Sequence, residues 1–170
     1  LRLFYLKYRK KINVYSDLET KKYLFKSFKY CFQNFKNYPA VLKHKNLKKT
    51  HVFDVGKDKI KIEYVRVKHG YIDSLGYLIN NKCAYISDAN EIYKNELLRL
   101  KNLKYLVVDC LRYKKHNSHF NLDDVLSLVK NLKPNKTILT NLHSDLDYVT
   151  LKKKLPVNIV PGYDGMTLRF

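Results

Sequence analysis

Histidines and aspartates follow several stretches of this sequence that are predicted to form β-strands. The four residues are His69 after "EYVRVK", Asp88 after "CAYIS", Asp109 after "YLVV", and His143 shortly after "TILT". In an open α/β sheet, sites gather at the carboxyl edge of the strands, where loops present side chains to one cleft. Two imidazoles and two carboxylates at one edge are enough to hold a divalent metal ion. The pattern therefore predicts a metal site assembled from separate strands.

Each of these residues also has a structural explanation when it is taken alone. A histidine at a strand end is often capped or solvated, and an aspartate there often caps the next element. The structural explanation is favoured for Asp109. Three other histidines lie in lysine-rich surroundings and are given no functional role; they are His44, His51 and His116.

A second group of polar residues lies in "HNSHFNLDD", residues 116–124. It places His119 just ahead of a helix that is predicted to begin near Asn121. An imidazole beside a helix N-terminus, together with backbone N–H donors, can bind a phosphate or another oxyanion. The alternative is that His119 only fills the position before the helix cap, and the spacing does not decide between the two.

The elements that must position these residues follow from hydrophobic periodicity. Alternation of apolar and polar residues predicts strands with one buried face at 12–15, 59–67, 76–80 and 83–87. The pair Asn80 and Asn81 predicts a hairpin turn between the last two. Continuous apolar runs predict strands buried on both faces at 105–108 and 137–140.

Helix signals lie between these strands. Ser16 with Glu19 predicts a capping box ahead of the first main helix, and Asn121 with Asp124 predicts another ahead of "VLSLVKNL", which Pro134 ends. The order of elements predicts an α/β fold with a mixed sheet. The lysine-rich range 34–51 is interpreted as a long surface loop, so that residues 1–170 form a single domain.

Composition bounds the class of protein. A chain of 170 residues with 45% hydrophobic residues can bury a core, and no apolar run is long enough for a membrane span, so a cytoplasmic protein is expected. The three cysteines share no CxxC spacing.

The net charge of +19 would attract nucleic acid or other polyanions, but it is spread through every segment and consists mainly of lysine. Compositional bias is therefore the favoured explanation, and non-specific polyanion binding remains the alternative.

Five segments, taken in order, resemble the metallo-β-lactamase-fold hydrolases. They are "VKHGYIDSLGYLI", "CAYISDANEI", "LVVDCLRYKKHNSHFNLDDVLSLVKNLKP", "LTNLHSDLDY" and "LPVNIVPGYDGM". The likeness is greatest to the branch that is similar to phosphoribosyl cyclic phosphate phosphodiesterase, and it is close from Glu63 to Met166. The resemblance implies a four-layer αββα sandwich and two divalent ions, zinc or manganese, bridged by one carboxylate and a shared water or hydroxide.

The resemblance also implies a role for individual residues. His69 matches a terminal ligand of one metal, Asp88 the bridging carboxylate, and His143 a terminal ligand of the other metal. His119 matches a catalytic histidine on the substrate side, which binds the phosphate or protonates the leaving alkoxide. Asp164 in "YDGM" matches a supporting residue near the site.

One part of the family pattern does not occur in residues 1–170. The HxHxDH segment, which supplies two ligands to each metal in the family, is not in this sequence. In relatives it precedes a stretch resembling "LRLFYLKYRKKINVYSDLETKKY", so it would fall upstream of Leu1. The chain is therefore interpreted as the carboxyl-terminal two-thirds of the fold, with an incomplete ligand set.

Three functional hypotheses follow. The first is a metal-dependent phosphodiesterase that acts on a small cyclic or nucleotide phosphodiester by two-metal activation of water. It is expected to be inactive unless the missing segment comes from a longer chain or a separate chain. The expected partners are such a separate chain or a second copy in a homodimer. The alternatives are a degenerate, non-catalytic remnant and a lysine-rich nucleic-acid-binding module on the same fold. The sequence leaves the substrate, the metal and the oligomeric state open.

Overall fold

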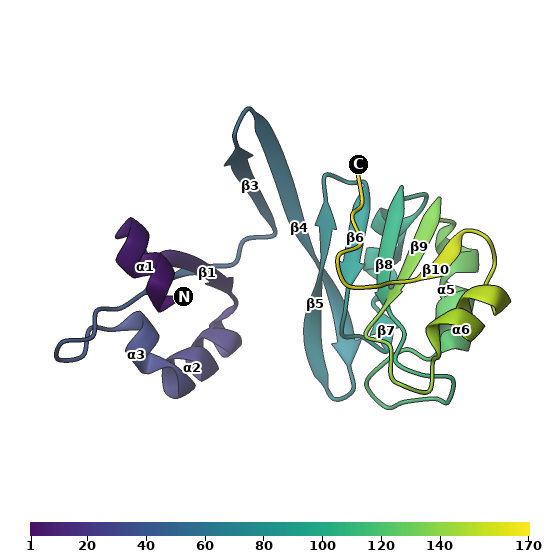
Figure 1. Ribbon diagram of the computed structural model, residues 1–170, viewed down its shortest axis with the longest axis horizontal. Helices are drawn as coiled ribbons and strands as arrows, with labels where there is room; N and C mark the ends of the chain where they lie inside the picture. The colour runs from purple at the N-terminus through teal and green to yellow at the C-terminus, as the bar shows by residue number, and fades with distance from the viewer. The chain divides into compact units, whose positions relative to one another are not determined.

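The computed structural model describes residues 1–170, which form two compact units, Leu1–Lys49 and Thr50–Phe170. Figure 1 shows the elements of each unit. The first unit has three helices around a small sheet, and the second has one large sheet with its own core. The mixture of helices and strands confirms the predicted α/β class. The single domain over residues 1–170 stays a prediction.

The first unit contains a two-stranded parallel sheet and three short helices. In chain order the elements are α1 (Arg2–Tyr8), β1 (Ile12–Ser16), α2 (Leu18–Ser27), α3 (Lys29–Phe32) and β2 (Leu42–Asn46). The strand predicted at 12–15 is β1, and Ile12 pairs with Leu42. The prediction that 34–51 is a loop is wrong, because β2 lies within it and Ala40, Val41 and Leu42 are buried. This short apolar run is flanked by lysines, which obscure its periodicity.

The capping box predicted at Ser16 and Glu19 is also wrong. Asp17 is the N-cap of α2, and its Oδ1 accepts a hydrogen bond from the Thr20 N–H at 2.8 Å. Ser16 is instead the last residue of β1, where it pairs with Asn46. Because Ser16 is held in the strand, the helix can begin only after the next residue, and aspartate is an equally good cap.

The second unit is built on one eight-stranded mixed sheet in the order β10-β9-β8-β6-β5-β4-β3, with β7 paired to β4. Its strands are β3 (Thr50–Val55), β4 (Asp58–His69), β5 (Ile72–Ile79), β6 (Cys83–Ile86), β7 (Glu91–Ile92), β8 (Tyr105–Asp109), β9 (Lys136–Thr140) and β10 (Ile159–Pro161). The five strands predicted between residues 59 and 140 correspond to β4, β5, β6, β8 and β9. Asn80 and Asn81 have φ of 50° and 53°, which confirms the predicted turn.

Helices α5 and α6 supply much of the apolar surface that the sheet buries. The helical elements of this unit are α4 (Lys94–Leu97), η1 (Leu98–Leu100), α5 (Leu122–Leu132) and α6 (Tyr148–Lys154). Figure 1 shows α5 and α6 beside β8, β9 and β10. The predicted capping box at Asn121 and Asp124 is present, and α5 buries Val125, Val129 and Leu132 in the core. No helix of residues 1–170 combines the length and the apolar character needed to span a bilayer.

The direction of the strands brings four carboxyl ends to one edge of this sheet. Strands β4 and β6 each run antiparallel to β5, whereas β8 and β9 run parallel to β6. Strands β4, β6, β8 and β9 therefore all end at the same edge. His69 is the last residue of β4 and Asp109 the last of β8, while the loops after β6 and β9 carry Asp88 and His143. The sheet thus places all four residues at the edge that the sequence predicted.

Candidate metal centre

Three side chains at this edge converge on one point. His69, Asp88 and His119 each offer one ligand atom, and these atoms all lie within 4.8 Å of one another. The Nε2 atoms of His69 and His119 are 3.1 Å apart. The two histidines are half-buried and Asp88 is exposed, so the group opens to solvent on one side. This arrangement is suited to a ligand that enters from solution.

The turn after β4 lets the loop that carries His119 come close. Gly70 has φ of 65°, and its N–H donates to Asn90 Oδ1 at 2.8 Å. A Cβ on Gly70 would lie 3.2 Å from the Cβ of Ser118. A glycine at this position therefore allows both the left-handed backbone and the close approach of the residue next to His119.

A buried carboxylate lies behind His119. Asp109 has no exposed surface, and its Oδ2 is 2.6 Å from His119 Nδ1 and accepts from the Ala89 N–H at 3.1 Å. Asn141 Nδ2 donates to Asp109 Oδ1 at 3.2 Å. Burial raises the pKa of Asp109 and these hydrogen bonds act in the opposite direction. When Asp109 is ionised it can only accept, and His119 Nδ1 is then the donor of this contact. The other ring nitrogen, Nε2, lies 3.1 Å from His69 Nε2.

His116 is a member of this neighbourhood that the sequence analysis gave no role. Its ring lies 5.3 Å from that of His119, and its Nδ1 is 3.2 Å from Ser118 Oγ. Desolvation and then the positive charge of Arg112 lower the pKa of His116. The spacing of His116 and His119 within one loop was the available signal. Asp109 was identified by its position at the end of a predicted strand, and Asn141 was not identified. The contacts of both residues with His119 depend on how β8 and β9 pair, which no local pattern showed.

Two predicted site residues lie outside the group. The His143 N–H donates to the Leu111 carbonyl at 2.9 Å, which keeps its backbone at the same edge. Its imidazole turns to Asp145, with Nδ1 2.9 Å from Oδ1, and the His143 side chain is 59% exposed. Asp164 is exposed beyond β10 and does not belong to the group. Their assignments to the site stay predictions.

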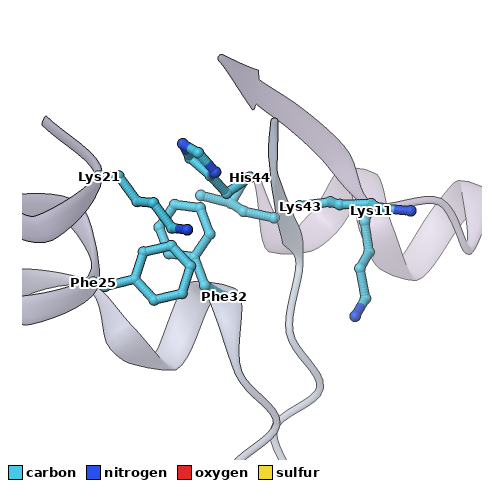
Figure 2. Close-up of a pocket in the computed structure, with 7 residues that line it drawn as sticks. Lys11, Lys21, Phe25, Phe32, Lys43 and His44 are labelled. Atoms are coloured by element: carbon cyan, nitrogen blue, oxygen red, sulfur yellow. The ribbon is translucent and has the colours of Figure 1, made fainter. Parts of the chain in front are cut away.

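A separate hollow of about 560 Å³ lies in the first unit. Figure 2 shows Lys21 and His44 beside the stacked rings of Phe25 and Phe32, while Lys43 points away from the rings. His44 Nε2 is 3.0 Å from Ser16 Oγ, a contact that joins β2 to β1. His44 thus has a structural contact. Neither His44 nor His51 belongs to the group of His69, Asp88 and His119.

The chemistry of the donor set fits a divalent transition metal. Imidazole nitrogen and carboxylate oxygen are ligands for zinc and its neighbours. The contact between Asp109 and His119 adds a second feature, since metal-ligating histidines usually donate their other ring N–H to a carboxylate or carbonyl. His69, Asp88 and His119 are therefore suited in chemical type to hold a metal ion.

Comparison with known proteins identifies the fold. The model of the family described as "Beta-lactamase superfamily domain" matches residues 2–141. The crystal structure of a diphosphatase from the PhnP family superimposes with a TM-score of 0.80 at 27% identity, over 94% of this chain and 59% of that one. Zinc-bound PqqB from Methylobacterium extorquens superimposes with a TM-score of 0.71 at 11% identity, over 97% of this chain and 67% of that one. The second likeness shows the fold alone.

A curated protein also matches part of the sequence. An octanoyltransferase from Porphyromonas gingivalis (strain ATCC BAA-308 / W83) is 31% identical over 110 residues, which are 63% of this chain and 22% of that protein. The chain thus spans about a fifth of that protein and 59% of the diphosphatase. The family match covers most of the chain, and the fold agrees with it along nearly the whole length. The chain belongs to the β-lactamase superfamily domain family, and its fold is that of the metallo-β-lactamase hydrolases.

Proposed function

We propose that the protein is a metal-dependent phosphodiesterase that acts on a small cyclic or nucleotide phosphodiester. The observation that carries this proposal is the convergence of His69, Asp88 and His119 at the carboxyl edge of the sheet. The similarity to a diphosphatase of the PhnP family supports a phosphorus–oxygen bond as the bond that is cleaved. The family match supports the broader statement that the protein has the fold of a hydrolase family.

In the proposed function, His69 and Asp88 are metal ligands. A bound zinc or manganese ion would supply a water of lowered pKa and neutralise charge on the phosphate. In a two-metal arrangement, His143 would hold the second ion and His119 would bind the phosphate or protonate the leaving oxygen. Asp109 holds the His119 ring through Nδ1, which leaves Nε2 on the side of His69. Protonation of the leaving oxygen from Nε2 would use the imidazolium form of His119, which carries a hydrogen on both nitrogens.

The two-metal arrangement needs ligands that residues 1–170 do not contain. No HxHxDH segment occurs in this sequence, and His69, Asp88 and His143 give each ion only one histidine and the shared carboxylate. Loss of ligands removes both bonds and the preorganisation that keeps the others aimed. We therefore propose full turnover only when such a segment is supplied, fused to the chain or in trans.

The test compares hydrolysis of bis(p-nitrophenyl) phosphate by residues 1–170 alone and with an added HxHxDH-bearing segment, in the presence of zinc or manganese. We expect activity in the completed form, its loss with chelator, and its loss in Asp88→Asn. Asp123→Asn, on the exposed first turn of α5, is the matched control and should stay active. Hydrolysis that survives both chelation and Asp88→Asn would rule the proposal out.

A further inference from the structure

The positive charge of the chain is concentrated in its first unit. Leu1–Lys49 contains fourteen lysines and arginines against two acidic residues, a net charge of +12 in 49 residues. Thr50–Phe170 contains twenty against thirteen, a net charge of +7 in 121 residues. The first unit also holds eleven of the 23 Phe and Tyr side chains. A small unit with this charge attracts a polyanion, and its many rings give that polyanion something to pack against.

The hollow of about 560 Å³ in this unit brings a cation and aromatic rings together, and no carboxylate lines it. Phe25 and Phe32 stack with ring centres 4.6 Å apart, and Lys21 Nζ lies 5.7 Å from the centre of the Phe25 ring (Figure 2). The His44 ring lies 6.1 Å from that of Phe25 and at 78° to it. A ligand in this hollow therefore meets positive charge and a flat apolar surface within a few ångströms.

A second hollow of the same chemical character lies in the first unit. It has a volume of about 360 Å³ and is lined by residues of α2 and α3 and of the segment that follows, among them Lys26, Lys29, Tyr30 and Phe35. Tyr30 and Phe35 are 55% and 60% exposed, so that their rings are accessible to a ligand. No carboxylate lines this hollow either. Because α2 and α3 contribute to both hollows, the two belong to one helical surface.

We propose that the first unit binds single-stranded nucleic acid. In the first hollow, Lys21 contacts a phosphate and Phe25 stacks on a base; in the second, Lys29 and Tyr30 do the same for another nucleotide of the strand. A basic surface that follows the backbone, with aromatic rings on which bases stack, is how proteins bind single strands without reading their sequence. This activity is additional to the proposed phosphodiesterase and does not depend on it.

Single-stranded nucleic acid fits these hollows better than a duplex or a membrane does. The bases of a single strand can be unstacked and placed on a ring, whereas those of a duplex are already paired and stacked. A bilayer takes up apolar side chains that protrude from an amphipathic surface, whereas these rings line hollows. Lysine binds phosphate as a point charge, without the forked geometry of arginine, so little preference for base sequence is expected.

The experiment measures binding of residues 1–170 to a short fluorescein-labelled oligouridylate by fluorescence anisotropy, between about 50 and 200 mM KCl. EDTA is present throughout, so that metal-dependent hydrolysis plays no part and the result is separate from that for the proposed function. The logarithm of the affinity should fall linearly with the logarithm of the salt concentration, with a slope of about −0.7 for each phosphate contacted.

Substitutions in the hollows separate the contact with phosphate from the contact with the base. Lys21→Gln should weaken binding and reduce the magnitude of the salt slope by about 0.7, because one phosphate contact is lost. Phe25→Leu keeps an apolar side chain and removes the ring. It should weaken binding at least about 5-fold and leave the slope unchanged, since stacking releases no counterions. Tyr30→Ala should act in the same way, and its exposure makes it tolerant of substitution.

Matched controls lie in the second unit. Lys130→Gln makes the same change of charge at an exposed position of α5, and Tyr71→Ala removes a fully exposed ring. Both should bind the strand like the unaltered chain. Inorganic polyphosphate has the charge without the bases, so its binding should be unaffected by Phe25→Leu and Tyr30→Ala. Circular dichroism and thermal unfolding show which variants are folded, and Tyr30→Ala tests the role of the rings if Phe25→Leu does not fold.

Three results would overturn the proposal. Oligouridylate binding that is unchanged in the folded aromatic variants, or weakened equally by Lys21→Gln and Lys130→Gln, would reduce it to diffuse attraction by charge. Displacement of the strand by uridine monophosphate as readily as by unlabelled oligouridylate would make the hollow a site for free nucleotides. Binding of phosphatidylserine vesicles but not of oligouridylate would assign the surface to a membrane instead.

Discussion

A carboxylate partner decides which way each of two histidines turns. His119 faces Asp109, which is fully buried, and His143 faces Asp145, which is 44% exposed. A buried charge-assisted hydrogen bond is strengthened by the low local dielectric, whereas an exposed ion pair contributes roughly 0–1 kcal/mol. The orientation of His119 is thus firmly held, and that of His143 is only weakly held. This difference between the two carboxylate partners explains why His119 lies with His69 and Asp88, whereas His143 does not.

Gly70 provides a test of how closely the His119 loop must approach β4. Alanine at Gly70 would need a left-handed backbone and would place its Cβ 3.2 Å from the Cβ of Ser118. Left-handed strain alone costs about 1–2 kcal/mol. We expect Gly70→Ala to lower the free energy of unfolding by more than this and to weaken Co²⁺ binding. The measurements are urea unfolding and a titration of the chain with Co²⁺ that is followed by its visible spectrum.

Gly56 is the matched control for this substitution. It has nearly the same φ, 63° against 65°, and an added Cβ would meet nothing within 4 Å. Gly56→Ala should therefore show the strain alone and bind Co²⁺ normally. In the double variant Gly70→Ala with Ser118→Gly, removal of the opposing Cβ should recover part of the excess loss. Equal destabilisation in the two alanine variants would mean that the contact with Ser118 is unimportant.

Helix α5 connects local sequence to the site at the scale of an element. Its N-cap, Asn121, is 7% exposed and lies two residues after His119. The side chain of Asn121 accepts from the Asp124 N–H at 2.8 Å, and the Asp124 side chain accepts from the Asn121 N–H in return. The cap therefore fixes both the start of the helix and the end of the loop that carries His119.

Removal of this cap should cost a measurable part of the stability. Loss of an N-cap side chain typically costs about 0.5–2 kcal/mol, and here it leaves the partly buried Asp124 N–H without its partner. We expect Asn121→Ala to shift the midpoint of urea unfolding downward by a corresponding amount. Asn131→Ala, on the exposed face of the same helix, should be neutral or slightly stabilising because alanine is the better helix former. Similar losses in both variants would show that the cap is not the cause.

At the scale of the whole molecule, a buried thiol makes stability depend on pH. Burial raises the pKa of Cys83 from 9.0 to about 11, and its side chain lies in β6 with 3% of its surface exposed. The unfolded chain releases this proton above pH 9, whereas the folded chain retains it up to about pH 11. The stability that Cys83 contributes is therefore complete below pH 9 and is lost as the pH rises toward 11.

The prediction is best measured as a difference between variants, because lysines and tyrosines also titrate in this range. Between pH 8 and pH 10, the stability advantage of the unaltered chain over Cys83→Ala should shrink by about 1 kcal/mol. Ile86→Val, in the same strand and without a titrating group, should differ from the unaltered chain by a constant amount. A constant difference for Cys83→Ala as well would mean that this thiol is not protected from ionisation in the folded state.

The sequence by itself determined the features that depend on near neighbours. Alternation in 59–67 and continuous apolar runs at 105–108 and 137–140 predicted strands, because the burial of alternate or successive side chains leaves a periodic pattern. The turn at Asn80 and Asn81 and the capping box at Asn121 also followed from residues within four positions of each other. The family resemblance rested on motifs of the same kind, and the family match confirmed it.

Only the tertiary structure decided which polar residues meet. His69 and His119 are 50 residues apart in the chain, and Asp109 and Asn141 are 32 residues apart. Their contacts depend on strand order and direction, which no local pattern specifies, and on whether a side chain finds a buried or an exposed partner. The sequence therefore identified the edge of the sheet on which the site lies. Strand pairing, the burial of Asp109 and the open turn at Gly70 placed His119, and not His143, beside His69.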